Sequence, residues 1–436
     1  MDTAVQLEIL GQGAVDLITS ADLAAKLDRA AAPGGRPLRA KLGIDPTGSE
    51  IHLGFAVVLR KLRQFQDLGH TAVLIIGDFT AQVGDPSGKS KTRERLDADV
   101  VAANAERYVE QICRILDPDR LEVRRNSEWL GTLDVGGVLG LTDATTVAQM
   151  LTRNDFRQRY ETGKPISLTE FMYPLFQGYD SVMIDADVEL GGTDQLFNLH
   201  MGRDLQLAAG QQPQVVLTTP LLVGIDPGFE THADGSIVPN KMSKSMGNTV
   251  GITEPITEMF GKLMSMPDDV PGDANPTARI ERYFQYATGW SQSVIDEHTQ
   301  AVRSKALHPN AAKRLLAATV CDLYHGSGAG AEAEAEFDRR FKRGGSGRPS
   351  EVPDVTIDPG LVGVDGTVRL GRVMVAAGLA KSSKEADRLI VQGGVRLDDE
   401  RVDATSPMPV ATLDGRILNV GKLGWARLSW SESNSA

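Results

Sequence analysis

A loop at residues 241–245 carries the chain's most distinctive chemical groups. It reads Lys241, Met242, Ser243, Lys244 and Ser245, so two lysines lie close together with a hydroxyl between them. Lysine ammonium groups bind phosphate oxygens as mobile point charges. In a flexible loop, they can follow the negative charge that develops when a phosphoryl bond breaks. A Lys/Ser pentamer alone is more often a solvated loop, so the prediction needs a second signal.

The second signal is a His-x-Gly sequence, His52 to Gly54, far upstream. It follows an expected strand and begins an expected helix, and the free N–H groups at a helix start favour an anion. His52 and Thr47 can donate hydrogen bonds to phosphate, and Gly54 lets a nucleotide approach the backbone. A lone His-x-Gly is usually structural, but paired with the lysine loop it predicts a nucleotide phosphate site.

The elements around these residues alternate between strand and helix. Residues 38–44 and 71–77 read as strands and 52–68 as the helix between them, which is one parallel crossover unit. Further strands are expected at 121–125, at 188–192 and at 215–223, with helices at 14–31, 100–116, 167–179 and 194–207. The fold class is therefore α/β, a doubly wound, Rossmann-like parallel sheet whose ligands lie at the carboxyl ends of the strands.

Composition changes divide the chain further. We expect a catalytic domain at 1–250, with an insertion and dimer region at about 130–187, and an α-helical domain at 251–343. The glycine- and serine-rich residues 343–350 begin a linker, placed at 344–366. A small α+β domain at 367–436 completes the chain.

Bulk properties limit the class of protein. The chain has 436 residues, 41% apolar and 24% charged, with a net charge of −12. This balance argues against non-specific wrapping of nucleic acid but leaves a local basic site open. Two cysteines, Cys113 and Cys321, suit a reducing compartment and form no metal-ligand cluster, so no protein-held metal is expected. Neither a signal peptide nor a membrane span is evident, and we expect a cytoplasmic protein.

The pair of phosphate signals resembles the signature of class I aminoacyl-tRNA synthetases. Finer sequences at 43–47, 84–88, 173–180 and 191–195 are similar to bacterial tyrosyl-tRNA synthetases of the branch with a Lys-Met-Ser-Lys-Ser loop. The resemblance covers essentially the whole chain. It implies a tyrosine–tRNA ligase that uses ATP with Mg²⁺, acts on L-tyrosine and tRNA(Tyr), and works as a homodimer.

The resemblance also implies roles for individual residues. Tyr173, Gln177 and Asp180 fall on one face of a helix. The aspartate matches the acceptor of the tyrosine phenol, and the other two, with Asp85, match positions around the α-amino group. Alone, the three would more often be a solvated polar face. The tyrosine-binding residues implied are Lys41, Asp85, Tyr173, Gln177, Asp180 and Gln195. The ATP-binding residues implied are Gly43, Asp45, His52, Gly54, Gly192, Asp194, Lys241, Met242, Ser243, Lys244 and Ser245.

The expected chemistry needs no catalytic base, because the substrate's own carboxylate attacks the α-phosphate of ATP. Catalysis is then positioning plus stabilisation of phosphate charge. We assign that stabilisation to Thr47, His52, Lys241 and Lys244.

Two positions depart from the family pattern. Phe55 stands where the first motif commonly has His or Asn, and a phenyl ring cannot hydrogen-bond the ribose, although it can pack against the sugar or the helix. Lys41 stands where many tyrosyl enzymes have a substrate-binding Tyr, and a lysine close to Asp180 would keep that carboxyl ionised.

A basic segment lies in the small C-terminal domain. Residues 367–397 contain six basic and two acidic side chains, a local balance of +4. They resemble the small RNA-binding module shared with a ribosomal small-subunit protein, which contacts tRNA in tyrosyl enzymes; residues 289–341 resemble the helical domain that reaches the anticodon. The tRNA-binding residues implied are Arg369, Arg372, Lys381, Lys384 and Arg388.

Other interpretations remain open. A paralogue could charge a tyrosine analogue or serve a specialised pathway, and Phe55 is its best support. A non-catalytic RNA-binding protein could keep the same fold. A tryptophanyl relative is less favoured, because Asp180 with Gln177 suits a phenol better than an indole N–H.

Overall fold

The computed structural model describes residues 1–48, 50–86, 97–231, 235–341, 348–349, 351–402, 405–421 and 424–430. The chain divides into two compact units, Met1–Gly330 and Ala331–Ala436. Ser87 and Gly88 of the 84–88 sequence, and much of the expected linker start, lie outside the described residues. Within those ranges, every helix is too short or too polar to span a lipid bilayer.

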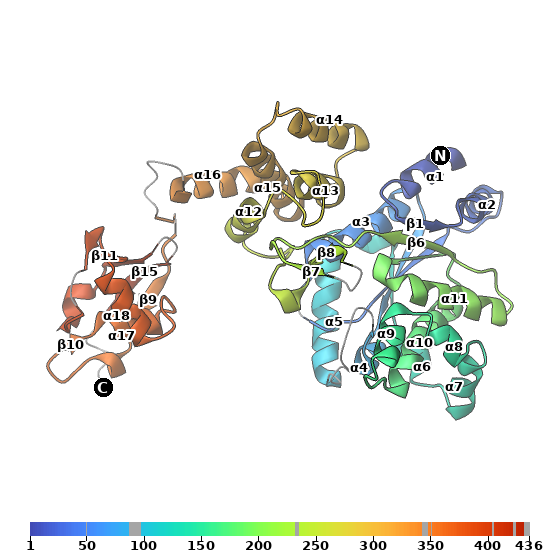
Figure 1. The fold of residues 1–436 in the computed structure, drawn as a ribbon, viewed down its shortest axis with the longest axis horizontal. Coiled ribbons are helices and arrows are strands. Elements are labelled where there is room, and N and C mark those ends of the chain that lie inside the picture. Colours follow the sequence, from blue (N-terminus) through green and yellow to red (C-terminus); the bar gives the residue numbers. More distant parts are fainter. Residues whose placement is uncertain are drawn as a thin grey trace. The chain divides into compact units, whose positions relative to one another are not determined.

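A six-stranded sheet organises the first unit (Figure 1). Its order is β1-β6-β5-β2-β3-β4, and all neighbours are parallel except β1 with β6. The strand order reverses between β2 and β5, which is where a doubly wound sheet opens a ligand crevice. The strands are β1 (Asp16–Ile18), β2 (Arg39–Ile44), β3 (Thr71–Ile76), β4 (Leu121–Arg125), β5 (Val188–Gly192) and β6 (Val215–Thr219).

Helices cover this sheet because their apolar sides need burial. In α3 (Leu53–Asp67), the residues Leu59, Leu62 and Phe65 are fully buried, and the helix packs across β2, β3, β5 and β6. Helices α10 (Leu168–Met183) and α11 (Leu196–Ala208) pack together over Val73 and Ile75 of β3. The remaining helices around the sheet are α1 (Thr3–Gly11), α2 (Ser20–Ala31), α4 (Thr80–Val83) and α5 (Ala98–Ile112).

The expected insertion is helical, and α7 within it packs against α10 (Figure 1). It follows α6 (Ser127–Leu130) and contains α7 (Val135–Thr142), α8 (Val147–Met150), α9 (Asn154–Glu161) and α10 itself. After β6, a short hairpin of β7 (Phe229–Thr231) and β8 (Ile237–Pro239) precedes the lysine loop. A helical part then follows, with α12 (Ile256–Ser265), α13 (Ala278–Ala287), α14 (Gln292–Arg303) and α15 (Pro309–His325).

The second unit is a small α+β fold. A five-stranded sheet, in the order β12-β11-β14-β15-β9, and helices α17 and α18 enclose an apolar core. A separate pair, β10 with β13, lies beside it. The helices are α16 (Ala329–Phe341), α17 (Leu370–Ala376) and α18 (Ser383–Val391), and the strands β9 (Asp354–Thr356), β10 (Thr367–Val368), β11 (Val395–Leu397), β12 (Glu400–Arg401), β13 (Met408–Pro409), β14 (Ile417–Val420) and β15 (Gly424–Ser429).

Three elements differ from the sequence expectation. The helix expected from residue 14 begins only at Ser20, because residues 16–18 pair with the open edge of β6 instead. The strand expected to reach residue 223 ends at Thr219, before Pro220, which lacks the N–H that a ladder needs. The range expected as linker contains β9, which pairs in parallel with β15 and so belongs to the small domain's sheet.

Candidate active site

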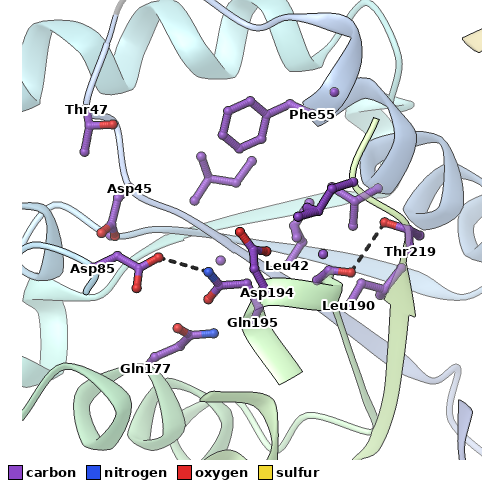
Figure 2. A pocket seen from close by; sticks show the side chains of 18 of the residues that line it. Leu42, Asp45, Thr47, Phe55, Asp85, Gln177, Leu190, Asp194, Gln195 and Thr219 are labelled. Carbon is purple, nitrogen blue, oxygen red and sulfur yellow. Dashed lines mark hydrogen bonds between the residues drawn. The ribbon is translucent and has the colours of Figure 1, made fainter. Parts of the chain in front are cut away.

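A cavity of about 300 Å³ lies beyond the carboxyl ends of β2, β3, β5 and β6. Most of the residues predicted for substrate binding line it together, although they come from distant parts of the sequence (Figure 2). Lys41, Lys244 and Ser245 are not among its lining residues. Those that line it are Gly43, Asp45, Thr47, His52, Gly54, Asp85, Tyr173, Gln177, Asp180, Gly192, Asp194, Gln195, Lys241, Met242 and Ser243.

The start of α3 places an uncharged imidazole at the cavity. His52 is the N-cap residue, but its side chain makes no capping bond, and its buried Nδ1 has no hydrogen-bond partner within the described residues. Burial, together with the charge of Lys244, lowers the pKa of His52 to about 4. A neutral imidazole can donate one N–H to a phosphate without carrying charge.

Gly54 lies directly against the ring of this histidine. A Cβ at Gly54 would lie 3.0 Å from two atoms of the His52 ring. Glycine at this position therefore leaves space for the histidine ring as well as for the approach of a nucleotide expected from the sequence. Phe55 lines the cavity, and its ring centroid lies 5.0 Å from that of His52. Figure 2 shows Phe55 across the cavity from Gln177.

Asp180 is a buried carboxyl group that lines the cavity. Its Oδ1 accepts a hydrogen bond of 2.8 Å from the Trp129 indole Nε1, and Asn126 Nδ2 lies 3.4 Å from its Oδ2. Burial raises the pKa of Asp180 to about 7, although the charge of Lys41 and these two donors act in the opposite direction. The group is therefore an acceptor whose ionisation changes near neutral pH.

Lys41 lies behind the cavity and forms a fully buried ion pair. Its Nζ lies 2.9 Å from Glu189 Oε1 and donates to Ser181 Oγ at 2.7 Å and to the Gln177 carbonyl at 2.9 Å. All three ammonium protons thus have protein partners. The charge of Lys41 lowers the pKa of Asp180, as expected from the sequence. Burial raises this pKa by more, so Lys41 does not by itself keep Asp180 ionised.

Further hydrogen bonds join the polar side chains that line the cavity. Tyr173 Oη donates to Asp45 Oδ2 at 2.9 Å, and Thr80 Oγ1 donates to Asp45 Oδ1 at 2.7 Å. Gln195 Nε2 donates to Asp85 Oδ2 at 2.9 Å, as Figure 2 shows. Burial and the charge of Asp45 raise the pKa of Tyr173 well above its usual value, so the phenol keeps its proton.

The lysine loop closes another side of the cavity. Lys241 Nζ lies 2.7 Å from Asp194 Oδ2, and Met242 N donates to the Leu222 carbonyl at 2.7 Å. Lys244 lies outside the lining, with its Nζ 5.4 Å from the centre of the Tyr108 ring. A Cβ at Gly48 would lie 2.6 Å from this Nζ, so the lysine reaches back to the loop after β2.

Comparison with known proteins identifies the fold and the family. The family model "tRNA synthetases class I (W and Y)" matches residues 33–342. A tyrosine–tRNA ligase of Geobacter sulfurreducens is 44% identical over 431 residues, which is 99% of this chain and 100% of that protein. One of Moorella thermoacetica is 46% identical over 428 residues, 98% of this chain and 96% of that protein.

This chain belongs to the class I tRNA synthetases, in the tyrosine–tRNA ligase family. Solved structures agree on the fold. A tyrosyl-tRNA synthetase of Archaeoglobus fulgidus, complexed with L-tyrosine, is similar with a TM-score of 0.58 and 21% identity, covering 76% of this chain and 99% of that chain. A tyrosyl-tRNA synthetase of Aeropyrum pernix is similar with a TM-score of 0.58 and 20% identity, and the match covers 77% of this chain and 99% of that chain.

The small domain of this synthetase also has a family match. Residues 368–406 match the S4 domain model. The five basic residues predicted for tRNA are all exposed, on or beside α17 and α18. Ser382 caps α18 by accepting from Glu385 N at 3.3 Å, and Glu385 Oε2 accepts from Lys381 N at 2.8 Å. This is close to the expected capping box, except that the backbone N–H that donates to Glu385 lies one residue earlier, at Lys381 and not at Ser382.

Several residues around the synthetase cavity were missed in the sequence. Trp129 and Asn126 contact Asp180, Glu189 contacts Lys41, and Arg153 contacts Asp85. Asn126, Trp129 and Arg153 lie outside the quoted motifs, and Glu189, although close to the 191–195 sequence, is in a buried strand where its spacing marks no partner. Asn198 had a signal, because it lies one helical turn after Gln195 and shares its side of the helix.

Proposed function

We propose that the chain activates L-tyrosine with ATP and transfers the tyrosyl group to tRNA(Tyr). The observation that carries the proposal is a single cavity that joins the carboxyl group of Asp180 to the start of α3 and to the lysine loop. One end offers hydrogen-bond acceptors for an amino acid with a hydroxyl group. The other offers donors and cations for phosphate.

The amino-acid end suits tyrosine. In the proposal Asp180 accepts the phenol hydrogen bond, while Asp85, Gln177 and the Tyr173 hydroxyl surround the α-ammonium group. A buried carboxyl that expects a phenol donor is left unpaired by phenylalanine. Sites of this kind discriminate by roughly 10⁴–10⁵ without editing. Trp129 supports the assignment, because its indole bonds Asp180 Oδ1, whereas Oδ2 has only the longer 3.4 Å contact with Asn126 among the described residues and can accept from a ligand.

The nucleotide end suits ATP, bound as its Mg²⁺ complex. In the first step the tyrosine carboxylate attacks the α-phosphorus, the bond to the bridging oxygen breaks, and pyrophosphate leaves. Thr47 and neutral His52 donate hydrogen bonds, and Lys241 and Lys244 supply positive charge to the leaving group. Lys244 has to leave the Tyr108 ring to do so, which supports a loop that moves during the reaction.

The second step uses the RNA. A 3′-terminal ribose hydroxyl attacks the tyrosyl carbonyl, and AMP leaves. The exposed basic residues of the S4 domain support a role in holding the tRNA. We place the enzyme in the cytoplasm, where ATP and tRNA meet.

Tyrosine-dependent ATP–pyrophosphate exchange, followed by tRNA charging, tests the proposal. We expect exchange with tyrosine and not with phenylalanine, and we expect Asp180→Ala to reduce that preference. Exchange that prefers a tyrosine analogue would favour the specialised paralogue, to which Phe55 gives some support. RNA binding without any exchange would favour a non-catalytic protein.

A homodimer is the second part of the proposal. Large apolar side chains are exposed on the insertion, among them Val135 (76%), Leu139 (59%) and Val147 (65%), with Tyr160 and Leu168 near them in sequence. Apolar surface gathered in one region marks a protein interface. Sedimentation should give a dimer, and Leu139→Asp with Val135→Asp should give a monomer. Val391→Asp, which changes an equally exposed residue of the S4 domain, is the matched control. A dimer that survives the double substitution would place the interface elsewhere.

A further inference from the structure

Three amide side chains meet beside the tyrosine end of the cavity. Gln177 and Gln195 line it, and Asn198, which is 1% exposed, lies between them. Asn198 Nδ2 donates to Gln177 Oε1 at 3.0 Å and to Gln195 Oε1 at 2.9 Å. The two ends of an amide have nearly the same shape, so the neighbours decide which end accepts and which donates.

The ends of this network have only one possible polarity. Arg153 can only donate, and its Nη1 gives Asn198 Oδ1 a hydrogen bond of 2.7 Å. The Asn198 NH₂ group must then face the two glutamine oxygens. At the opposite ends Gln177 Nε2 donates to Glu189 Oε1 at 3.3 Å, and Gln195 Nε2 donates to Asp85 Oδ2.

Arg153 is held firmly enough to impose that polarity. Its side chain is 6% exposed, and its Nε donates to both oxygens of Asp155, at 2.8 and 3.0 Å. The guanidinium lies over the rings of Phe156 and Phe197, at 5.2 and 5.8 Å. Its Nη2 is 3.7 Å from Asp85 Oδ1. The residue comes from the insertion, so this region contributes to the amino-acid site.

We propose that Arg153 and Asn198 are positioning residues for recognition of the substrate's α-ammonium group. They fix the orientation of both glutamine amides, which keeps Gln177 Oε1 an acceptor beside Asp85 and the Tyr173 hydroxyl. The inference rests on the proposed function, because it assumes that an ammonium-bearing tyrosine binds here.

Two substitutions of Asn198 test the polarity. Asn198→Asp keeps the shape but replaces the donor by an acceptor, and Asn198→Leu removes the donor without adding charge. Either way the Gln177 and Gln195 oxygens lose their common donor, and the amides can turn. We expect the tyrosine KM in ATP–pyrophosphate exchange to rise at least tenfold in both variants. The ATP KM and kcat should stay within about threefold of wild type. Asn310→Asp, an exposed Asn-to-Asp change on α15, is the control for added charge.

Calorimetry with two probes separates positioning from general damage. Tyrosinol carries the phenol and the ammonium group, whereas 3-(4-hydroxyphenyl)propan-1-ol lacks the ammonium group. We expect the variants to lose at least tenfold in tyrosinol affinity and less than twofold for the deaminated alcohol. Equal losses for both probes, or an unchanged tyrosine KM, would overturn the inference. Arg153→Lys, which keeps the charge but not the fork that joins Asn198 to Asp155, provides the same measurement if the Asn198 variants do not fold. A wild-type chain without tyrosine-dependent exchange would instead refute the proposed function.

Discussion

At the scale of single residues, Asp180 shows how burial and hydrogen bonding compete in this site. Burial disfavours the carboxylate, while Lys41, Trp129 and Asn126 favour it. Burial has the larger effect, so the pKa of Asp180 lies near 7 and not in its usual acidic range. The phenol acceptor of the proposed reaction therefore titrates close to the working pH.

This titration predicts a pH dependence of tyrosine capture. A phenol O–H donates best to an ionised carboxylate, and only about a tenth of Asp180 is ionised one unit below its pKa. We expect kcat/KM for tyrosine, which reports the free enzyme, to fall about tenfold between pH 8 and pH 6. Exchange kinetics across this range check it. The residual activity of Asp180→Asn should not follow the same curve, and a flat wild-type profile would contradict the assignment.

The ionisation of Asp180 also affects the stability of the folded chain. Its pKa is about 7 when folded and about 3.8 when unfolded, so the folded chain binds the proton more tightly between these values. Its contribution to stability is therefore lost as pH rises from about 4 to 7. The side chain at position 180 of the Asp180→Asn variant cannot titrate, so the variant does not lose this contribution. We expect the free energy of unfolding of the variant, relative to that of wild type, to be higher at pH 8 than at pH 5 by roughly 3 kcal/mol. Urea unfolding of both proteins at the two pH values measures the difference. If the difference in unfolding free energy between the two proteins is the same at both pH values, the pKa of Asp180 is not raised by folding.

Lys244 gives a kinetic prediction. It rests against Tyr108 outside the cavity lining, and in the proposed mechanism it meets the pyrophosphate after the loop moves. Lys244→Ala should slow adenylate formation by about 100-fold or more while tyrosine affinity changes less than twofold, because the interaction is made in the transition state. Rapid-quench kinetics measure the step. Lys164→Ala, at an exposed position, is the matched control. An unchanged rate would remove Lys244 from the mechanism.

The role of a single residue can be predicted from the sequence when its partners are close to it in the sequence. Tyr173, Gln177 and Asp180 share a helix face, and the cavity receives all three. The partner of Lys41 could not be predicted, because Glu189 lies on the neighbouring strand and only the packing of β2 against β5 brings them together.

At the scale of elements, hydrogen bonds of the Asn248 side chain hold the lysine loop. Asn248 Oδ1 accepts from Ser243 N at 2.7 Å, and its Nδ2 donates to Asp226 Oδ1 at 2.7 Å. Asn248 is 1% exposed. The loop is thus fixed at its base, while Lys244 near its tip makes a cation–ring contact and a weak 3.4 Å bond with Tyr108.

Asn248→Ala should release this base. Removing a buried hydrogen-bonding side chain costs about 1–3 kcal/mol, and the loop backbone loses its only side-chain anchor at Ser243 N among the described contacts. We expect adenylate formation to slow by at least tenfold with tyrosine affinity unchanged, and protease cleavage near residues 241–248 to become faster. Val238→Ala, on the exposed hairpin β7–β8, is the comparison. Unchanged kinetics and cleavage would show that Asn248 does not hold the loop.

Helices and strands whose apolar residues follow one clear periodicity could be predicted from the sequence. A segment whose apolar residues fit both the helical and the strand periodicity could not. The helix at 53–67 and the strand at 71–76 were predicted to within a few residues, because burial on one face or on both faces leaves a distinct pattern. Residues 16–18 fit a helix as well as a strand. Only the open edge of β6, which sequence cannot reveal, makes them a strand.

At the scale of the whole molecule, the two units have separate expected tasks. The first holds the cavity, and the second presents the exposed basic side chains of α17 and α18 within a chain of net charge −12. Because a local basic surface supplies salt-dependent RNA affinity, damage to it should leave the chemistry of the first step intact.

Charge reversal in the S4 domain tests this division. Arg372 and Lys384 are exposed on α17 and α18, and no ion pair involves either within the described residues, so their replacement leaves no partner unpaired. Arg372→Glu with Lys384→Glu should lower kcat/KM for tRNA charging at least tenfold at about 0.1 M salt, because attraction to phosphates becomes repulsion. The salt dependence of charging should weaken, while tyrosine-dependent ATP–pyrophosphate exchange stays within twofold of wild type. If charging is unaffected, the RNA is held elsewhere, and if exchange falls as well, the two tasks are not separate.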